Sequence, residues 1–486
     1  MINIKLFNLI VTFSENDRKN LNLFIKSQDN IAGRKYYPLF KELERYKMYP
    51  DKLKLIPAEK IFENAYGGKK FSKQTISNRQ TELLKLILRY FEQTSNQNNQ
   101  LARLNSLYNE LLSRNLLSEF RKIYDKNLKI HNEYLFKEES YKDLQETVLN
   151  DASYYQFKKM PEKANEIYFS HSKILMADIL CKLYRTGLEF LVQKYYSISH
   201  EQNPILNLIE SVNGDEFFES LAETSEKIFI IPQIRYFLFK CFQFPGEKKY
   251  IRQAEKIYFE NEKYFYDDFK IDVYRMIMSY YIIKINIGET KYYENLYRLY
   301  VRKLKQNLVS DIKYCNYPAN IFREYVITGI RVKKFKWVEK VIKKYSPLLP
   351  ENIRGDEYSL AMIRFHFAKN EFAQALKIIV EHKSNNIMHY FDLSMYRLII
   401  YYEMNRYEEA YYEIDRIKHF MKNRNDIPEV TLKPFRKFIN IFQKLLNFRS
   451  NPNDKKYDNL MFELKRNNGA YVMKSWLAEK VISLNR

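Results

Sequence analysis

The sequence predicts an all-α protein, an α-solenoid of helical hairpins, on three observations. One phrase recurs, as KKFKWVEKVIKKY from Lys333, KNEFAQALKIIVEH from Lys369 and MNRYEEAYYEIDRI from Met404. These starts lie about 35 to 37 residues apart, which is the period of stacked tetratricopeptide-like hairpins. Glycine and proline number only ten and thirteen in 486 residues, too few for the turns of a typical sheet protein. Hydrophobic residues make up 46 % of the chain, so wholesale disorder is excluded.

Each phrase has the same internal order: a polar turn, an aromatic residue, and a small or β-branched residue three positions later. The aromatic and small residues are Phe335 with Val338, Phe372 with Ala375, and Tyr407 with Ala410. Similar phrases occur earlier, with Ala164 in KKMPEKANEIYF and Ala254 in KKYIRQAEKIYF. We therefore expect the hairpins to continue through the middle of the chain, with the small residues packed between helices.

Residues 1–95 are expected to form a separate N-terminal helical module. Helices are predicted from Ser14, over YYPLFKELERYKM, over AEKIFENAY, and after a turn at Gly67 and Gly68. Ser72 is expected to cap that last helix. Its apolar stripe is Ile76, Leu83, Ile87 and Phe91. The polar stretch QTSNQNNQ, residues 93–100, is predicted to be a linker.

The start of the helix after Ser72, SKQTISNRQTEL, resembles the second helix of a helix-turn-helix. Short polar side chains there would reach base edges, while lysine and arginine would hold phosphates. The candidate contacts are Lys69, Lys70, Lys73, Gln74, Thr75, Ser77, Asn78 and Arg79. The alternative is a helical cap that covers the first repeat of the solenoid.

The rest of the chain is predicted to be a tetratricopeptide-like solenoid over residues 101–445, followed by capping helices over 455–486. A hairpin is expected to turn near Arg114 and Asn115, and another pair of helices to span Tyr134–Phe157 and Pro161–Tyr184. Gly288 is expected to be a hinge between two later helices. The acidic segment from Asn203 to Lys227 is expected to be the least regular part.

Charge distribution nominates a binding surface. The formal net charge is +22, which is typical of proteins with polyanionic partners, although an A/T-rich genome produces similar lysine enrichment without any such function. Fourteen Lys and Arg against four acids lie between residues 291 and 350. Within the basic segment 291–344, the candidate contacts for nucleic acid or an acidic partner are Arg331, Lys333, Lys334 and Lys336.

No catalytic, cofactor or metal site is predicted. The chain lacks a Gly-rich phosphate loop, and its seven histidines, which we expect to be partly exposed, include no metal-binding spacing. Cys181, Cys241 and Cys315 are interpreted as buried free thiols in a reducing cytoplasm. MINIKLFNLIVTF is not a convincing signal peptide, and no apolar run is long enough to span a bilayer.

Several segments together resemble a group of uncharacterised, full-length helical-repeat proteins of Bacteroidota-type bacteria. The resemblance is carried by NIGETKYYENLYRLY, NIFREYVITGIRVKKFKWVEKVIKKYSPLLPE and PFRKFINIFQKLL, and covers nearly the whole chain. It rests mainly on packing positions such as Gly329, Trp337 and Tyr345. It implies a tetratricopeptide-like solenoid and no catalytic activity.

Two functions follow as hypotheses. The first is a non-catalytic, cytoplasmic scaffold or adaptor that binds a protein partner on the concave face of a basic solenoid, where an acidic or extended peptide would fit best. The second is nucleic-acid binding through the N-terminal helix and the basic segment 291–344. No cofactor and no membrane association are expected, and the sequence does not determine the oligomeric state.

Overall fold

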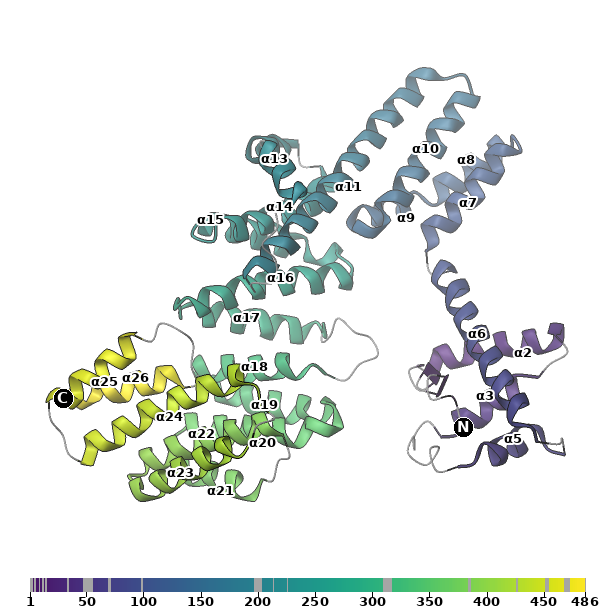
Figure 1. Cartoon of the computed structure of the whole chain (residues 1–486). Coiled ribbons are helices and arrows are strands. Elements are labelled where there is room, and N and C mark those ends of the chain that lie inside the picture. Colours follow the sequence, from purple (N-terminus) through teal and green to yellow (C-terminus); the bar gives the residue numbers. More distant parts are fainter. Residues whose placement is uncertain are drawn as a thin grey trace. The chain divides into compact units, whose positions relative to one another are not determined.

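The computed structural model describes residues 3, 6–7, 9–10, 13, 15–32, 35–46, 56–68, 71–97, 99–195, 203–212, 214–224, 226–308, 317–382, 386–424, 427–450, 454–466 and 473–485. These residues form helices and no strand, which confirms the predicted all-α class (Figure 1). The chain divides into two compact units, Met1–Lys270 and Ile271–Arg486. The predicted division into modules 1–95, 101–445 and 455–486 stays a prediction.

The first helices of unit 1 surround a core of their own. They are α2 (Glu15–Ala32), α3 (Tyr37–Glu44), α5 (Ala58–Tyr66) and α6 (Lys73–Gln97). The Thr75 amide donates a hydrogen bond of 3.4 Å to Ser72 Oγ, so the predicted cap is confirmed. Ile76, Leu83 and Ile87 are buried as expected, but Phe91 is partly exposed and stacks on Phe13.

The predicted linker, residues 93–100, lies where one helix ends and the next begins, and its role as a linker stays a prediction. Helix α6 continues to Gln97, and α7 (Gln100–Ser113) begins three residues later. Asn99 caps α7 by accepting a hydrogen bond of 3.1 Å from the Ala102 amide, and its Nδ2 donates to Asp143 at 2.6 Å. The stretch therefore contains the end of α6 and the N-terminal cap of α7.

The remaining helices of unit 1 pack largely in chain order. They are α8 (Leu117–Lys126), α9 (Leu128–Glu133), the 3-10 turns η1 (Tyr134–Phe136) and η2 (Glu138–Ser140), α10 (Tyr141–Phe157), α11 (Pro161–Tyr195), α12 (Pro204–Ser211), α13 (Gly214–Thr224), η3 (Lys227–Phe229), α14 (Ile230–Gln243), α15 (Lys248–Asn261) and η4 (Glu262–Tyr264). Cys181 and Cys241 are buried and free, as predicted, whereas Cys315 lies outside the described residues.

Helix α16 (Asp267–Asn286) crosses the boundary between the units, and Gly288 follows it with φ +100°. The helices of unit 2 after it are α17 (Tyr292–Lys305), α18 (Ala319–Arg331), α19 (Phe335–Tyr345), η5 (Ser346–Leu348), α20 (Glu351–Ala368), α21 (Phe372–Glu381), α22 (Ile387–Glu403), α23 (Tyr407–Lys422), α24 (Glu429–Ser450), α25 (Asp454–Arg466), α26 (Lys474–Ile482) and η6 (Ser483–Asn485).

Five helix pairs are joined by the same connection: α7–α8, α10–α11, α18–α19, α20–α21 and α22–α23. In each, the second residue after the first helix has a left-handed backbone, and the next helix begins two residues later. The left-handed residues are Asn115, Lys159, Lys333, Asn370 and Asn405. At α18–α19, Lys333 N–H donates to Ile330 O at 2.9 Å and Lys334 N–H to Gly329 O at 2.8 Å. This pair of bonds closes the end of a helix as a Schellman motif.

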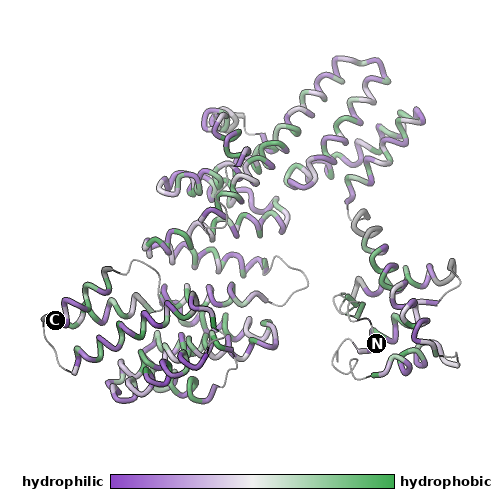
Figure 2. The backbone as a smooth tube through the Cα atoms, in the orientation of Figure 1, coloured by the Kyte–Doolittle hydropathy of each residue, from purple (hydrophilic) through white to green (hydrophobic). Residues whose placement is uncertain are grey.

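The small residues of the recurring phrase are buried beside these connections, as predicted. Val338, Ala375 and Ala410 are each 0 % exposed, and Ala164 is 2 % exposed. Close packing also explains Gly329, because a Cβ there would lie 2.5 Å from Val338 Cγ2 and 2.8 Å from Trp337 Cε3. Hydrophobic and hydrophilic residues alternate along these helices (Figure 2).

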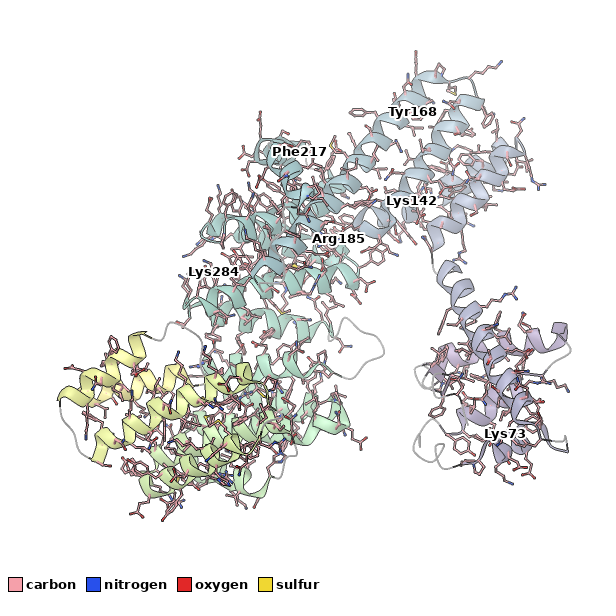
Figure 3. The ribbon with its side chains drawn as sticks, viewed as in Figure 1. Lys73, Lys142, Tyr168, Arg185, Phe217 and Lys284 are labelled. Carbon is pink, nitrogen blue, oxygen red and sulfur yellow. The ribbon has the colours of Figure 1, made fainter. Side chains whose placement is uncertain are left out.

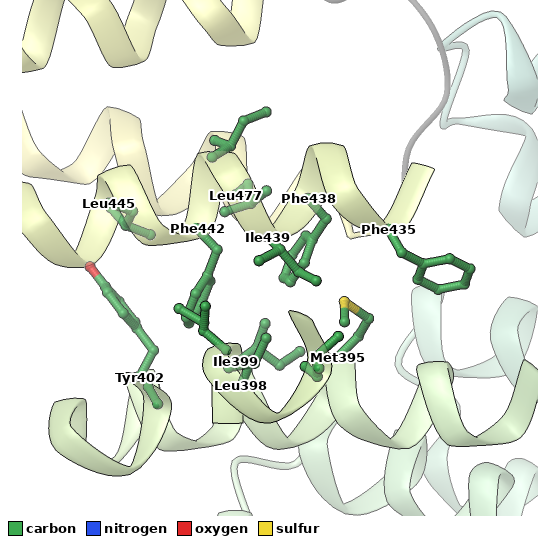
Figure 4. Packing of buried hydrophobic residues seen from close by; sticks show 14 of the residues in the cluster. Met395, Leu398, Ile399, Tyr402, Phe435, Phe438, Ile439, Phe442, Leu445 and Leu477 are labelled. Carbon is green, nitrogen blue, oxygen red and sulfur yellow. The ribbon is translucent and has the colours of Figure 1, made fainter. Parts of the chain in front are cut away.

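A large cluster of buried apolar residues lies near the C-terminus of unit 2. Phe438, Ile439, Phe442 and Leu445 on α24 contact Met395, Leu398, Ile399 and Tyr402 on α22, with Leu477 of α26 beside them (Figure 4). Trp476 donates its Nε1–H to Glu403 Oε1 at 2.7 Å. This packing turns the opposite, polar side of α24 to solvent.

Candidate binding surfaces

The predicted N-terminal contacts lie on the first turns of α6, where the structure describes them. Lys73, labelled in Figure 3, is exposed, as are Gln74 and Asn78. The Gln74 Nε2 donates to Asn78 Oδ1 at 3.0 Å, as expected for residues four apart on one helix face. Thr75 and Ser77 are exposed as well, whereas Lys69 and Lys70 lie outside the described residues.

Arg79 makes contacts with other residues of the chain. Its Nη1 donates to the Lys35 carbonyl at 3.2 Å, and its guanidinium lies 5.7 Å from the Tyr36 ring and 5.3 Å from the Tyr66 ring. These contacts hold α6 against α5 and the start of α3. A contact between Arg79 and a ligand stays a prediction, and it would require the release of this packing.

The predicted basic residues Arg331, Lys333, Lys334 and Lys336 come together at the α18–α19 connection, and all four are exposed. Lys333 occupies the left-handed position of the Schellman motif, so its backbone is fixed while its side chain points outward. Lys334 Nζ lies 5.8 Å from the Tyr297 ring, and Arg331 Nη2 lies 3.5 Å from Ser475 Oγ. The structure therefore places these four exposed cations together at one helix connection.

A second basic surface, which the sequence did not suggest, lies on the solvent side of α24. We call it the α24 trough. It consists of two adjoining hollows of about 600 Å³ and about 280 Å³ that share Arg436 and Asn440. Its lining residues are Lys418, Met421 and Lys422 from α23, Glu429, Lys433, Arg436, Lys437, Ile439, Asn440, Ile441, Gln443, Lys444 and Asn447 from α24, and Glu463 from α25.

Hydrogen bonds position the side chains of the α24 trough. Arg436 Nη1 donates to both carboxylate oxygens of Glu429, at 2.7 and 2.8 Å, and Lys444 Nζ lies 2.8 Å from Glu463 Oε1. Lys418 donates to Gln443 Oε1 at 2.6 Å, and the Tyr411 hydroxyl donates to Asn447 Oδ1 at 2.8 Å. The arrangement suits binding of an anion that also offers hydrogen-bonding groups.

A helical spacing of polar residues is the sequence signal for this trough. Lys433, Arg436, Asn440, Lys444 and Asn447 recur every three or four residues within PFRKFINIFQKLLNF and its flanks. Residues 418–447 contain seven Lys and Arg against two acids. The count of basic and acidic residues in the stretch 291–350 does not reveal this stripe, because the stripe lies outside that stretch and its charges are spread over two helices.

A hollow of about 690 Å³ in unit 1 has a different chemistry. Phe136 and Tyr264 stack there with centroids 5.0 Å apart, and the rings of Phe265 and Tyr266 complete the aromatic lining. The charged and amide groups are Lys129, Asn132, Glu133 and Lys263. With two lysines and one glutamate, this hollow is nearly neutral, so its contacts would come mainly from its rings.

Buried titratable groups connect α18, α20 and α22. Glu357 is 1 % exposed, accepts from Arg323 Nε at 2.7 Å and lies 3.2 Å from His389 Nε2. Burial opposes ionisation of Glu357, but the hydrogen bonds from Arg323 and His389 outweigh it and lower its pKa to about 2. Asp392, on the same helix as His389, has a pKa raised by burial. The burial of His389 and His131 contradicts our expectation that the histidines are partly exposed.

One serine, one histidine and one aspartate also come together in unit 2. Ser359 Oγ lies 3.1 Å from His382 Nδ1, and His382 Nε2 lies 2.7 Å from Asp356 Oδ1. Ser359 and Asp356 are three residues apart on α20, and His382 directly follows α21. Ser359 sits within a helix and is 9 % exposed, and none of the three residues lines the α24 trough. The contacts therefore fasten the end of α21 to α20.

Neither a metal site nor a membrane span is found in the part of the chain that the structure describes. No group of three or more His, Cys, Asp or Glu there is arranged to hold a metal ion. No helix in the same residues combines the length and the apolar character needed to cross a bilayer. Comparison of the chain with protein-family models, with curated proteins and with solved structures finds no match.

Proposed function

We propose that this protein is a non-catalytic scaffold, a tetratricopeptide-like α-solenoid that binds a protein partner on its basic concave face. The recurring connection at Asn115, Lys159, Lys333, Asn370 and Asn405 supports the repeat architecture, because each instance joins two helices with the same backbone. The resemblance to helical-repeat proteins of Bacteroidota-type bacteria agrees with it. Binding by such a protein would need surface complementarity and no reacting group.

The α24 trough is the observation that carries this proposal. It is concave, it lies on exposed faces of regular helices, and its cations outnumber its acids. A rigid helical surface with fixed polar groups binds a partner segment without first ordering its own chain, which reduces the entropic cost of association. A cytoplasmic location agrees with the buried free thiols Cys181 and Cys241 and stays part of the proposal.

Purification of the tagged, full-length protein from its native host tests this function. We expect a protein partner to be recovered in stoichiometric amount, and to be retained after treatment of the extract with DNase and RNase. Identification by mass spectrometry and cross-linking would locate the partner on the chain. Loss of every partner upon nuclease treatment would contradict the proposal.

Nucleic-acid binding is the second candidate. The exposed polar side chains Lys73, Gln74 and Asn78 on α6 and the exposed cations at the α18–α19 connection favour it. Both surfaces present side chains that can reach phosphates. The engagement of Arg79 with Lys35, Tyr36 and Tyr66 leaves one fewer cation for this role.

A further inference from the structure

We propose that the α24 trough holds an acidic, extended segment of the protein partner, with carboxylates on the lysines and the peptide backbone on the amides. This inference rests on the proposed scaffold function and adds the partner's chemistry and its place on the chain. Four kinds of observation carry it: the charge of the trough, its amide groups, its length and the carboxylates that it already contains.

Charge favours an anionic occupant. Six cations line the trough, namely Lys418, Lys422, Lys433, Arg436, Lys437 and Lys444, against the two acids Glu429 and Glu463. Both acids are paired with cations of the trough itself. The excess of positive charge in a concave surface attracts an anionic segment and raises its rate of association.

The amides favour a peptide over a nucleic acid. Asn440, Gln443 and Asn447 present both donors and acceptors, and a peptide backbone needs both, whereas a phosphate backbone offers acceptors. Lys418 and Tyr411 orient two of these amides. Single-stranded nucleic acids also depend on stacking against aromatic rings, and the described lining of the trough contains none.

The length of the trough fits a short peptide. Its polar stripe runs on α24 from Lys433 to Asn447. Fourteen residues of helix rise by about 21 Å, which an extended chain covers with about six residues at ~3.3 Å each. Side chains two apart on such a segment point the same way, so alternate acidic residues would all face the lysines.

The two acids of the trough show that its cations can bind carboxylates. A single nitrogen of Arg436, Nη1, contacts both carboxylate oxygens of Glu429, whose side chain is 67 % exposed. An exposed pair of this kind contributes little to stability, so a partner carboxylate can displace it. Glu429 and Glu463 therefore mark positions at which carboxylates of the partner would bind Arg436 and Lys444.

Binding of two probes of equal charge to the full-length protein tests the proposal. We would use hexaglutamate with a fluorescein-labelled amino terminus and an amidated carboxyl terminus, and an oligothymidylate with the same label and six phosphodiesters, and measure fluorescence anisotropy at one low salt concentration. The trough variant is Lys422→Glu/Lys433→Glu, and its matched control is Lys122→Glu/Lys126→Glu on α8, outside every proposed binding surface. All four lysines are exposed, so both variants should fold, which circular dichroism would verify.

We expect the wild type to bind hexaglutamate more tightly than oligothymidylate, and the trough variant to weaken peptide binding about tenfold or more. The control should change it less than about twofold, because its charges lie on another surface. Equal losses in both variants would show attraction to net charge alone and would overturn the proposal. Tighter, trough-dependent binding of oligothymidylate would overturn it in favour of nucleic acid.

Glu429→Gln is expected to raise the affinity for hexaglutamate. Removal of an acidic side chain far from the trough should not have this effect. Removal of the Glu429 carboxylate frees Arg436, and hexaglutamate should bind about threefold tighter or more. Glu381→Gln, which removes an exposed acid that lies 3.9 Å from Lys377, is the matched control and should have no such effect. Unchanged affinity in Glu429→Gln would overturn the assignment of Arg436.

The co-purified partner separates this inference from the proposed function. If the trough variant retains the partner as well as the wild type does, the scaffold function stands and the trough assignment fails. If the wild type retains no protein partner, the proposed function itself fails, whatever the peptide probe does.

Discussion

His131 is a neutral histidine buried among aromatic rings. Its Nε2 lies 3.1 Å from the Tyr108 hydroxyl and its ring 4.7 Å from that of Tyr124. Burial, with a smaller contribution from Arg121, lowers its pKa to about 4. Its Nδ1 has no hydrogen-bond partner among the described residues, so a proton there would be unsatisfied.

This pKa predicts an acid-sensitive contribution to stability. The unfolded chain binds a proton near pH 6.5 and the folded chain only near pH 4, so folding is favoured fully above 6.5 and progressively less as the pH falls toward 4. His131→Phe should lower the free energy of unfolding by about 1 kcal/mol at neutral pH, because the contact with Tyr108 is lost. It should also make the thermal midpoint less dependent on pH between 6.5 and 4. His419→Phe, at an exposed histidine, serves as the control. If the thermal midpoint of His131→Phe fell with pH as steeply as that of the wild type, the assignment would be contradicted.

Glu357 makes a contribution that is lost at lower pH. Its pKa falls from 4.5 in the unfolded chain to about 2, so the stability that its ionised form provides is complete above about 4.5 and disappears as the pH falls toward 2. Glu357→Gln should destabilise unit 2 by about 1–3 kcal/mol at pH 7, because Arg323 and His389 lose a buried acceptor. Urea unfolding at pH 7 and pH 3 measures this effect. The difference in the free energy of unfolding between the wild type and Glu357→Gln should be smaller at pH 3.

The burial of single residues was predictable from sequence where a repeat or an apolar helical stripe placed them. Ala375 and Ala410 were expected to be buried because they hold the same position in recurring phrases. His131 and His389 have no such context, since their burial depends on rings and acids brought from distant helices. Their environments became visible only in the folded chain.

At the scale of helices, the connection between paired helices and the buried small residue form one recurring structural motif. The left-handed residue ends the first helix, and five positions later Val338, Ala375 or Ala410 lies against the preceding helix. Ala375 packs in a cluster with Ile363, Ile379, Leu393 and Ile400. A larger side chain at this point has no room without moving a helix.

Ala375→Phe should therefore destabilise the protein by about 1–3 kcal/mol through overpacking. Chemical unfolding followed by circular dichroism would measure the change. Ala373→Phe is a matched control two residues away, because Ala373 lies on the same helix and is exposed. Equal stability of the two variants would mean that the small position is not required for packing.

Helix boundaries were predictable where glycine, proline or a cap marks them. Ser72, Gly288 and the turns at Asn115 and Lys333 were all suggested by sequence. The helical conformation of residues 93–97 was not predicted, because their polar composition is also that of loops. Helix α6 continues there, and composition alone does not distinguish the two cases.

At the scale of the whole molecule, the all-α class followed from composition and period, but the α24 trough did not. Its residues come from three helices, and only the packing of α22 against α24 exposes their common polar side. The net charge of +22 raised the expectation of a polyanionic partner without indicating a surface. Surfaces made by neighbouring helices need the fold before they can be recognised.

Nucleic-acid binding makes a prediction about the entire charge distribution. If about four phosphates are contacted, affinity for duplex DNA should fall roughly 100-fold as salt rises from about 50 to about 200 mM. Lys336→Glu should weaken binding and flatten this dependence, whereas Lys377→Glu on α21 should leave both unchanged. An absence of binding at low salt, measured by electrophoretic mobility shift, would eliminate this second candidate.

The uniform connection between paired helices has an evolutionary consequence. Lys333, Asn370 and Asn405 repeat at intervals of 37 and 35 residues, and each is followed by the same two-residue step into the next helix. A gene duplication or deletion of one such interval would join compatible backbone ends, with no new loop to be selected. The number of paired helices can therefore change between descendants while the conformation of the connection stays constant.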